Sequence, residues 1–130
     1  MKYLITLILI VLLQVKSSAQ KKEKLTHQIV YNKIIESGLK HPKIILKQSI
    51  HESGNFKSKA AINKNNILGI MKGSRIRYFS SVEECLLFYK ERIQNRYNGG
   101  DYYMFLKRIG YAEDKNYTQK LKNTPLFIIE

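Results

Sequence analysis

The residue best suited to chemistry in this chain is Glu52, which stands directly before Ser53 and Gly54 at the expected end of an apolar helix. A helix C-terminus carries partial negative charge, and burial near Ile50 and Phe56 would remove water; both effects raise the pKa of a carboxyl group. A carboxylic acid that keeps its proton near neutral pH can protonate a glycosidic oxygen. The sequence therefore predicts a sugar-cleaving enzyme, with an exposed helix-end glutamate as the alternative interpretation.

A metal site is the other chemistry that this position suggests. The pair His51-Glu52 begins the zinc-protease pattern, which needs a second histidine four residues after the first. Asn55 occupies that place, and His27 and His41 belong to other segments. We therefore expect no metal and no organic cofactor.

The elements that must position Glu52 can be read from apolar periodicity and capping residues. Between residues 54 and 77 the pattern loses its period, which indicates a loop with a short strand pair around 67–71 and 75–79. The fold class is thus mostly α (α+β), with a small, shortened loop/strand lobe. The expected helices run from Thr26 to Gly38, from Pro42 to Glu52, from Ser81 to Ile93, from Asp101 to Gly110 and from Asp114 to Leu121.

Several short motifs occur in an order that resembles the glucosaminidase family that cleaves bacterial peptidoglycan, glycoside hydrolase family 73. The resemblance spans about residues 44–122, which makes it more specific than any one motif. The motifs are Gln48, Glu52-Ser53-Gly54, Ser58, Asn65-Asn66, Leu68-Gly69-Ile70, Tyr78-Phe79-Ser80-Ser81, Gly110-Tyr111-Ala112-Glu113-Asp114, Asn116-Tyr117 and Lys120-Leu121.

The resemblance implies a lysozyme-like helical domain and a role for each matched residue. Glu52 matches the family's catalytic acid, and Tyr111 matches a catalytic-site tyrosine that lines the cleft. Asn66 matches the second asparagine of the pair that shapes the neighbouring loop, and we expect Asn66, Tyr78 and Tyr117 to bind substrate. Tyrosine offers sugars an apolar face and a hydroxyl group. The alternatives are that Asn66 belongs to a simple turn and that the tyrosines belong to the core.

The sequence lacks the second catalytic acid at the place where members of the resembled family often have it. The segment from Gly69 to Tyr78 is basic and contains no carboxylate. Of the candidates that remain, Glu83, Glu84 and Asp114 are better explained as helix caps, which leaves Glu113. A mechanism with one acid is therefore plausible: Glu52 protonates the leaving oxygen, and the acetamido group of the substrate or a water completes the displacement.

The first 19 residues predict a secretory signal peptide. A basic start at Lys2 precedes the apolar run Leu4–Leu13, and Ser17-Ser18-Ala19 gives a cleavage site after Ala19. The run is shorter than the roughly 20 residues that span a bilayer, so an uncleaved anchor is the weaker alternative. We expect residues 20–130 to form one catalytic domain that is periplasmic or extracellular, without an integral membrane span. A single cysteine, Cys85, excludes an internal disulfide.

The net charge of +13 indicates an anionic partner. We interpret it as affinity for cell-wall glycan strands, the expected substrate, with an ordinary solvated surface as the alternative. Nucleic acid is not expected, because the lysines are scattered and no groove-reading motif is present. We also expect a monomer. Three alternative functions stay open: a lytic transglycosylase, a catalytically silent wall-binding module and a membrane-active toxin.

Overall fold

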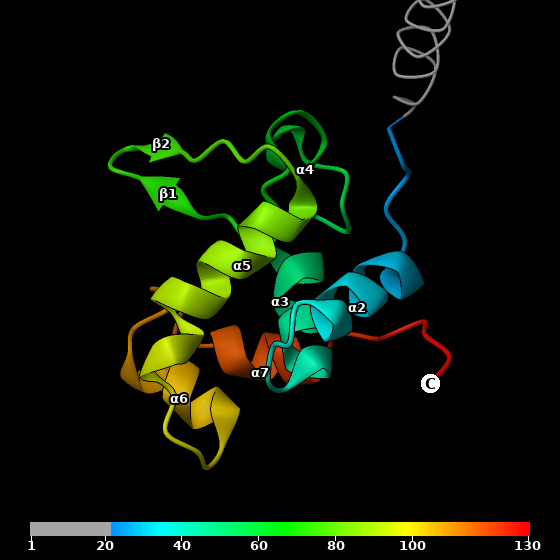
Figure 1. Cartoon of the computed structure of the whole chain (residues 1–130). Helices are drawn as coiled ribbons and strands as arrows, with labels where there is room; N and C mark the ends of the chain where they lie inside the picture. The colour runs from blue at the N-terminus through cyan, green and yellow to red at the C-terminus, as the bar shows by residue number, and fades with distance from the viewer. Residues whose placement is uncertain (1–21) are drawn as a thin grey trace, which may run out of the picture.

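The apolar helix that ends at Glu52 lies in the middle of the molecule, where it packs against α2, the preceding helix, and α7, the last helix of the chain (Figure 1). The computed structural model describes residues 22–130, so the predicted signal peptide lies outside the described residues. The elements are α2 (His27–Glu36), α3 (Pro42–Glu52), α4 (Lys59–Lys64), β1 (Met71–Lys72), β2 (Arg75–Ile76), α5 (Val82–Arg92), the 3-10 helix η1 (Gln94–Arg96), α6 (Tyr102–Arg108) and α7 (Tyr117–Lys122).

Most helices begin where the sequence places a capping residue. The side-chain oxygens of Thr26, Ser81 and Asp101 each accept a hydrogen bond from a backbone N–H three residues later, which confirms these three caps. The predicted cap at Asp114 is wrong. Helix α7 begins after Asn116, and the Asp114 carboxylate instead accepts a bond of 2.9 Å from the Asn116 N–H in the preceding turn.

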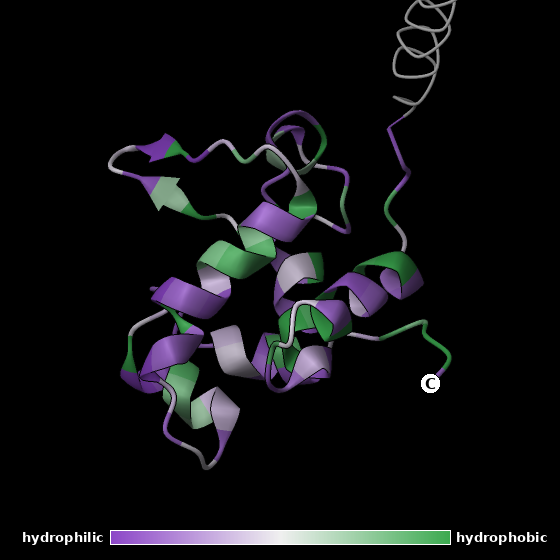
Figure 2. Ribbon diagram, viewed as in Figure 1, coloured by the Kyte–Doolittle hydropathy of each residue, from purple (hydrophilic) through white to green (hydrophobic). Residues whose placement is uncertain are grey.

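The core is built from the apolar faces of all the longer helices. Hydrophobic and hydrophilic residues alternate along α2 and α5, as expected for helices with one face against the core (Figure 2). The fully buried large side chains include Ile34, Ile45, Leu46, Leu86, Tyr89, Phe105 and Leu121. The helix α3 is buried along its apolar face, as its composition predicts.

Cys85 lies in this core, on the inner face of α5. Its thiol is fully buried against the backbone of Ile67 and Leu68, and the loss of water raises its pKa to about 12. Among the described residues it is a free cysteine. The packing of this part of the core therefore needs no covalent link.

The small lobe, residues 59–79, consists of α4 and a short hairpin that projects beside the N-terminal end of α5 (Figure 1). The antiparallel strands pair Met71 with Ile76 and Lys72 with Arg75, so the hairpin is shorter than the sequence predicted. The sequence also missed α4. Ser58 caps this helix, but six residues are too few to show a helical period.

The fold class predicted from the sequence is confirmed: the part of the chain that the structure describes is mostly helical with one small antiparallel sheet. Within residues 22–130, no helix is both long and apolar enough to cross a bilayer.

Candidate functional site

Glu52 is the last residue of α3, and its half-buried side chain lines a groove. Loss of water around the carboxyl group raises its pKa, which agrees with the expectation from the sequence. A hydrogen bond from Tyr117 and the nearby His51 act in the opposite direction. Burial is the largest of these effects, so the environment favours the protonated acid.

The chain leaves Glu52 through a tight turn. The buried Ser53 hydroxyl donates to the carbonyl of Ser49 and accepts from the backbone N–H of Phe56. The three residues Gly54, Asn55 and Phe56 follow with φ of 57°, 58° and 66°. These angles lie in the left-handed region, which residues other than glycine seldom adopt. This turn ends α3 at the glutamate and leads the chain away from the groove.

Gly69 forms the wall that faces Glu52. A Cβ atom at this position would lie 2.9 Å from Oε2 of Glu52, closer than unstrained contacts allow, and Gly69 has φ of +64°. Glycine therefore serves two purposes here, because it permits both the backbone conformation and the close approach of the loop to the carboxyl group.

Asn66 fixes the loop that carries Gly69. Its side-chain amide donates to the carbonyls of Ile70 at 2.7 Å and Arg77 at 2.9 Å, and its oxygen accepts from the Ile70 N–H at 3.0 Å. The side chain is only 1% exposed. Asn66 thus supports the loop, and its predicted role in substrate binding stays a prediction.

Tyr111 reaches the groove from the segment between α6 and α7. Its hydroxyl donates to the carbonyl of Leu68 at 3.2 Å, which ties this segment to the loop beside Glu52. Burial raises the pKa of Tyr111 well above its usual value, so the phenol stays neutral. The structure thus brings Tyr111 and Glu52 to one groove, where Tyr111 can line the path of a sugar but cannot act as an anionic base.

Tyr117 lies beneath Tyr111 and is 5% exposed. The two rings stack with centroids 5.8 Å apart, and the edge of His51 meets the Tyr117 ring at 5.4 Å. Its hydroxyl lies beside the Glu52 carboxyl group, and burial raises the pKa of Tyr117 far above its usual value. Tyr117, expected to bind substrate, is placed to act on the acid.

Tyr78 is a predicted site residue that lies outside the groove of Glu52. Its side chain is 66% exposed after β2, and it does not line the Glu52 groove. No contact in the described part of the chain assigns it to the site, so its role in substrate binding stays a prediction.

The groove has a volume of about 400 Å³, and apolar side chains line it together with one carboxyl group and one guanidinium group. Of its lining residues, all within 22–130, Glu52 is the only carboxylate and Arg96 the only basic side chain. The lining residues are Glu52, Leu68, Gly69, Ile70, Met71, Phe88, Ile93, Arg96, Ile109, Gly110 and Tyr111. The sequence did not predict Arg96, because only the fold brings η1 beside the Glu52 loop.

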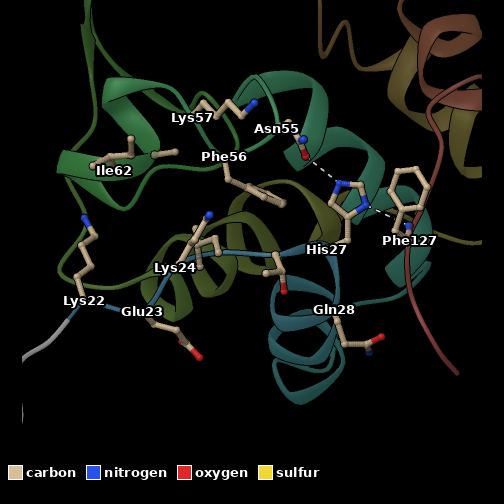
Figure 3. A pocket seen from close by; sticks show the side chains of 13 residues that line it. Lys22, Glu23, Lys24, His27, Gln28, Asn55, Phe56, Lys57, Ile62 and Phe127 are labelled. Atoms are coloured by element: carbon tan, nitrogen blue, oxygen red, sulfur yellow. Dashed lines mark hydrogen bonds between the residues drawn. The ribbon is translucent and has the colours of Figure 1, made fainter.

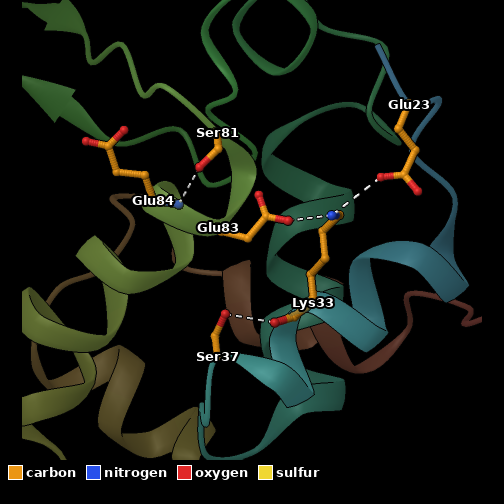
Figure 4. Close-up of polar contacts among 6 residues, drawn as sticks. All are labelled: Glu23, Lys33, Ser37, Ser81, Glu83 and Glu84. Carbon is orange, nitrogen blue, oxygen red and sulfur yellow. Dashed lines mark hydrogen bonds and ion pairs between the residues drawn. The ribbon is translucent and has the colours of Figure 1, made fainter. Parts of the chain in front are cut away.

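The candidates for a second acid are engaged elsewhere. The Glu84 N–H donates to the side chain of the N-cap residue Ser81 (Figure 4). Its carboxylate accepts from the backbone N–H and hydroxyl of Ser80, one residue before the N-cap that a standard capping box would use. Glu83 was predicted as a cap, but it pairs with Lys33 of α2 at 2.5 Å. Both carboxyl groups have lowered pKa values through these bonds.

Two further carboxylates border a separate hollow. Asp114 pairs with Lys120 at 2.5 Å, and this bond lowers its pKa. Glu113 also lines that neighbouring hollow, together with Tyr117, and not the Glu52 groove. Within residues 22–130, no group of three acidic, histidine or cysteine side chains is placed to hold a metal ion.

A larger hollow of about 670 Å³ lies at the start of α2, away from these groups. Phe56, Ile62 and Phe127 form much of its apolar lining, and His27 bonds Asn55 and the backbone of Phe127 at its edge (Figure 3). Glu23 is its only carboxylate among the described residues. It offers apolar volume without a buried acid, so we place the candidate active site at Glu52.

Comparison with known proteins identifies a family. A model of the glucosaminidase family, described as mannosyl-glycoprotein endo-beta-N-acetylglucosaminidase, matches residues 20–125. No curated protein and no solved structure matches the chain.

Proposed function

The chain belongs to the glucosaminidase family, a family of glycosidases, and on this premise we propose that it is an exported peptidoglycan hydrolase. It cleaves β-1,4 glycosidic bonds of the glycan strands at N-acetylglucosamine, as an endo-β-N-acetylglucosaminidase. The observation that carries this proposal is the half-buried carboxyl group of Glu52, whose pKa is raised in an open groove. The basic surface supports an anionic wall as the place of action.

Glu52 acts as the general acid. Its proton passes to the glycosidic oxygen as the bond to the anomeric carbon breaks, and the leaving sugar departs as a neutral alcohol. The pKa shift increases the fraction of Glu52 that holds a proton at neutral pH. Gly69 gives the carboxyl group its close backbone wall, and Tyr111 supplies an aromatic surface along the groove.

The positive charge that develops at the anomeric carbon needs a partner on its other side. Because Glu52 is the only carboxylate among the described residues that line the groove, we propose that the substrate's acetamido oxygen or a bound water supplies it. Attack by the acetamido group and then by water retains the anomeric configuration, whereas direct attack by water inverts it. Proton NMR of the first products distinguishes the two routes.

The decisive experiment compares the parent with the Glu52→Gln variant on gels that contain cell walls. We expect clearing by the parent and its loss in the variant, whose amide cannot give up a proton. Glu84→Gln is the matched control, since it changes an exposed carboxylate of a helix cap and should leave clearing intact. Equal clearing by the parent and Glu52→Gln would refute the proposed acid. Wall binding without clearing by either protein would indicate the silent module.

A lytic transglycosylase is the second candidate, and the single acid of the groove favours it. Such an enzyme also uses one glutamate but releases an anhydro sugar in place of a reducing end. Mass spectrometry of wall digests separates the two candidates, because a hydrolysed product contains one more water. We expect the hydrated product.

A further inference from the structure

A chain of buried hydrogen bonds crosses the core behind the groove. From the far end, the Gln94 amide bonds the Tyr102 hydroxyl at 3.2 Å, and the hydroxyls of Tyr102 and Tyr89 are 2.7 Å apart. Tyr89 bonds the side-chain oxygen of Gln48 at 2.7 Å, and the Gln48 nitrogen bonds the Tyr117 hydroxyl at 3.4 Å. All five side chains are buried.

At the Gln94 end of this hydrogen-bond chain, the donor and acceptor roles are fixed. The backbone N–H of Lys40 donates to the Gln94 side-chain oxygen at 2.6 Å, and the Gln94 nitrogen donates to the Lys40 carbonyl at 2.8 Å. A backbone N–H can only donate and a backbone carbonyl can only accept, so the Gln94 amide has one orientation. It must therefore act as a donor to the Tyr102 hydroxyl.

Each following hydroxyl has a single hydrogen, and because the group is buried this hydrogen needs an acceptor, so the direction passes along the hydrogen-bond chain. Tyr102 receives a hydrogen bond and gives its own hydrogen to Tyr89, and Tyr89 gives its hydrogen to the Gln48 oxygen. The Gln48 amide is thereby oriented with its nitrogen toward Tyr117. Since Tyr117 accepts from Gln48, the hydrogen of Tyr117 is free for the Glu52 carboxyl group, which lies beside it.

We infer that Gln48 and Tyr89 are positioning residues that hold the Tyr117 hydroxyl as a hydrogen-bond donor to the Glu52 carboxyl group, in an orientation set by the backbone of Lys40. The inference rests on the proposed function, in which Glu52 is the general acid. This row of hydrogen bonds fixes the position of one carboxyl oxygen of Glu52. It also opposes the rise in pKa that burial causes, because a hydrogen-bond donor stabilises the ionised form. The carboxylate that remains after proton transfer is thereby stabilised.

Other groups around Glu52 must be considered in any test of this inference. His51 precedes it on α3, Tyr111 faces it from the segment before α7, and Arg96 of η1 lines the same groove. Asp114 lies near His51. None of these groups takes part in the hydrogen-bond chain from Lys40, so variants within that chain leave them in place.

The test measures the titration of the Glu52 carboxyl carbon by NMR in the glutamate-labelled protein, with the signal assigned by its loss in Glu52→Gln. Tyr117→Phe removes the donor and should move the midpoint upward. Tyr89→Phe is the stricter test, because this residue is remote from Glu52. Without the Tyr89 hydroxyl, the Gln48 amide can rotate its oxygen toward Tyr117 and draw that hydroxyl away from Glu52. We expect an upward shift here as well.

The matched control is Tyr97→Phe. Tyr97 is also a buried tyrosine, but its hydroxyl bonds His41 and the Gly100 carbonyl outside this chain. We expect no shift of the Glu52 midpoint in the control, and an upward shift of the alkaline limb of wall clearing only in Tyr89→Phe and Tyr117→Phe. Equal midpoints in Tyr89→Phe and the parent would overturn the inference, since a merely structural role of Tyr89 changes stability alone.

A measurement on the parent protein covers the case in which Tyr89→Phe does not fold. The buried Tyr117 hydroxyl proton, assigned by its loss in Tyr117→Phe, should move downfield as Glu52 ionises. If the chemical shift of this proton does not change as Glu52 ionises, the inference is contradicted. The two proposals fail separately: wall clearing by Glu52→Gln removes the proposed function, whereas the titrations judge the hydrogen-bond chain without any activity.

Discussion

Glutamates at two helix ends show how position decides the chemistry of one residue type. At the start of α5, Glu84 accepts from Ser80 and Glu83 pairs with Lys33, and these bonds lower both pKa values. At the end of α3, Glu52 has lost much of its water, and its pKa is raised. A helix N-terminus supplies donors that favour a carboxylate, whereas a buried C-terminus favours the acid. The same side chain is thus structural in one region and suited to catalysis in the other.

The largest effect should follow from crowding the acid without changing it. In Gly69→Ala the new Cβ lies 2.9 Å from the flexible Oε2 of Glu52, so the carboxyl group must move. Displacement of a catalytic group by about 1 Å can reduce the rate by about 10²-fold, and we expect a loss of this size in wall clearing.

Gly73→Ala is the matched control for this variant. Gly73 has φ of +61°, close to the +64° of Gly69, but a Cβ there meets no atom within 4 Å. Both variants should therefore lose similar stability in urea unfolding, while only Gly69→Ala loses activity. Equal activity losses would mean that backbone strain in the lobe matters and contact with Glu52 does not.

The next effect concerns the support behind the acid. Asn66→Ala removes three hydrogen bonds of a buried side chain and leaves backbone groups of Ile70 and Arg77 without partners. We expect the free energy of unfolding to fall by about 3 kcal/mol in urea titration. Asn63→Ala changes an exposed asparagine of α4 and should stay within about 0.5 kcal/mol of the parent. A small loss for Asn66→Ala would contradict its supporting role.

The contrast between the regions also predicts opposite dependences of stability on pH. Because the folded pKa of Glu52 is raised above 4.5, the native chain binds more protons than the unfolded chain between the two values. Stability of the parent falls as pH rises through this window. Glu52→Gln should therefore match the parent most closely below pH 4.5 and gain in relative melting temperature toward neutral pH. A constant difference across pH would show that Glu52 ionises as it does in the unfolded chain.

The smallest effect is expected at the other helix end. The folded pKa of Glu83 is lowered, so its stabilisation is present above the ordinary value of 4.5 and is lost as pH falls through the folded pKa. Its carboxylate is largely exposed, and Glu83→Gln should cost roughly 0.2–1 kcal/mol at pH 7 without altering wall clearing. The stability difference between Glu83→Gln and the parent should disappear at acidic pH. The parent is the more stable protein at neutral pH in this pair, whereas Glu52→Gln gains stability relative to the parent toward neutral pH. A loss of clearing would return Glu83 to the candidates for a second acid.

The sequence predicted the features that rest on local signals. The ends of α3 and the caps at Thr26, Ser81 and Asp101 follow from residue types within a few positions of one another. The raised pKa of Glu52 follows from its place in an apolar helix. Motif order led to the glucosaminidase family, which the match over residues 20–125 confirms.

The missed features depend on contacts between distant segments. Arg96 enters the groove because η1 packs near the Glu52 loop, and Glu83 meets Lys33 across two helices. The bonds of Asn66 to Ile70 and Arg77 require the completed hairpin. No spacing in the sequence reports such pairings, since they are set by tertiary packing.

Alkylation of the buried Cys85 thiol can report local opening of the core between α5 and the loop beside Glu52. With a pKa of about 12 and no exposed surface, it offers an alkylating reagent no thiolate at neutral pH. Labelling requires α5 to separate from Ile67 and Leu68, the residues that lead into the loop opposite Glu52. The mass added per chain over time would thus report how often this part of the core opens beside the candidate active site, with no engineered probe.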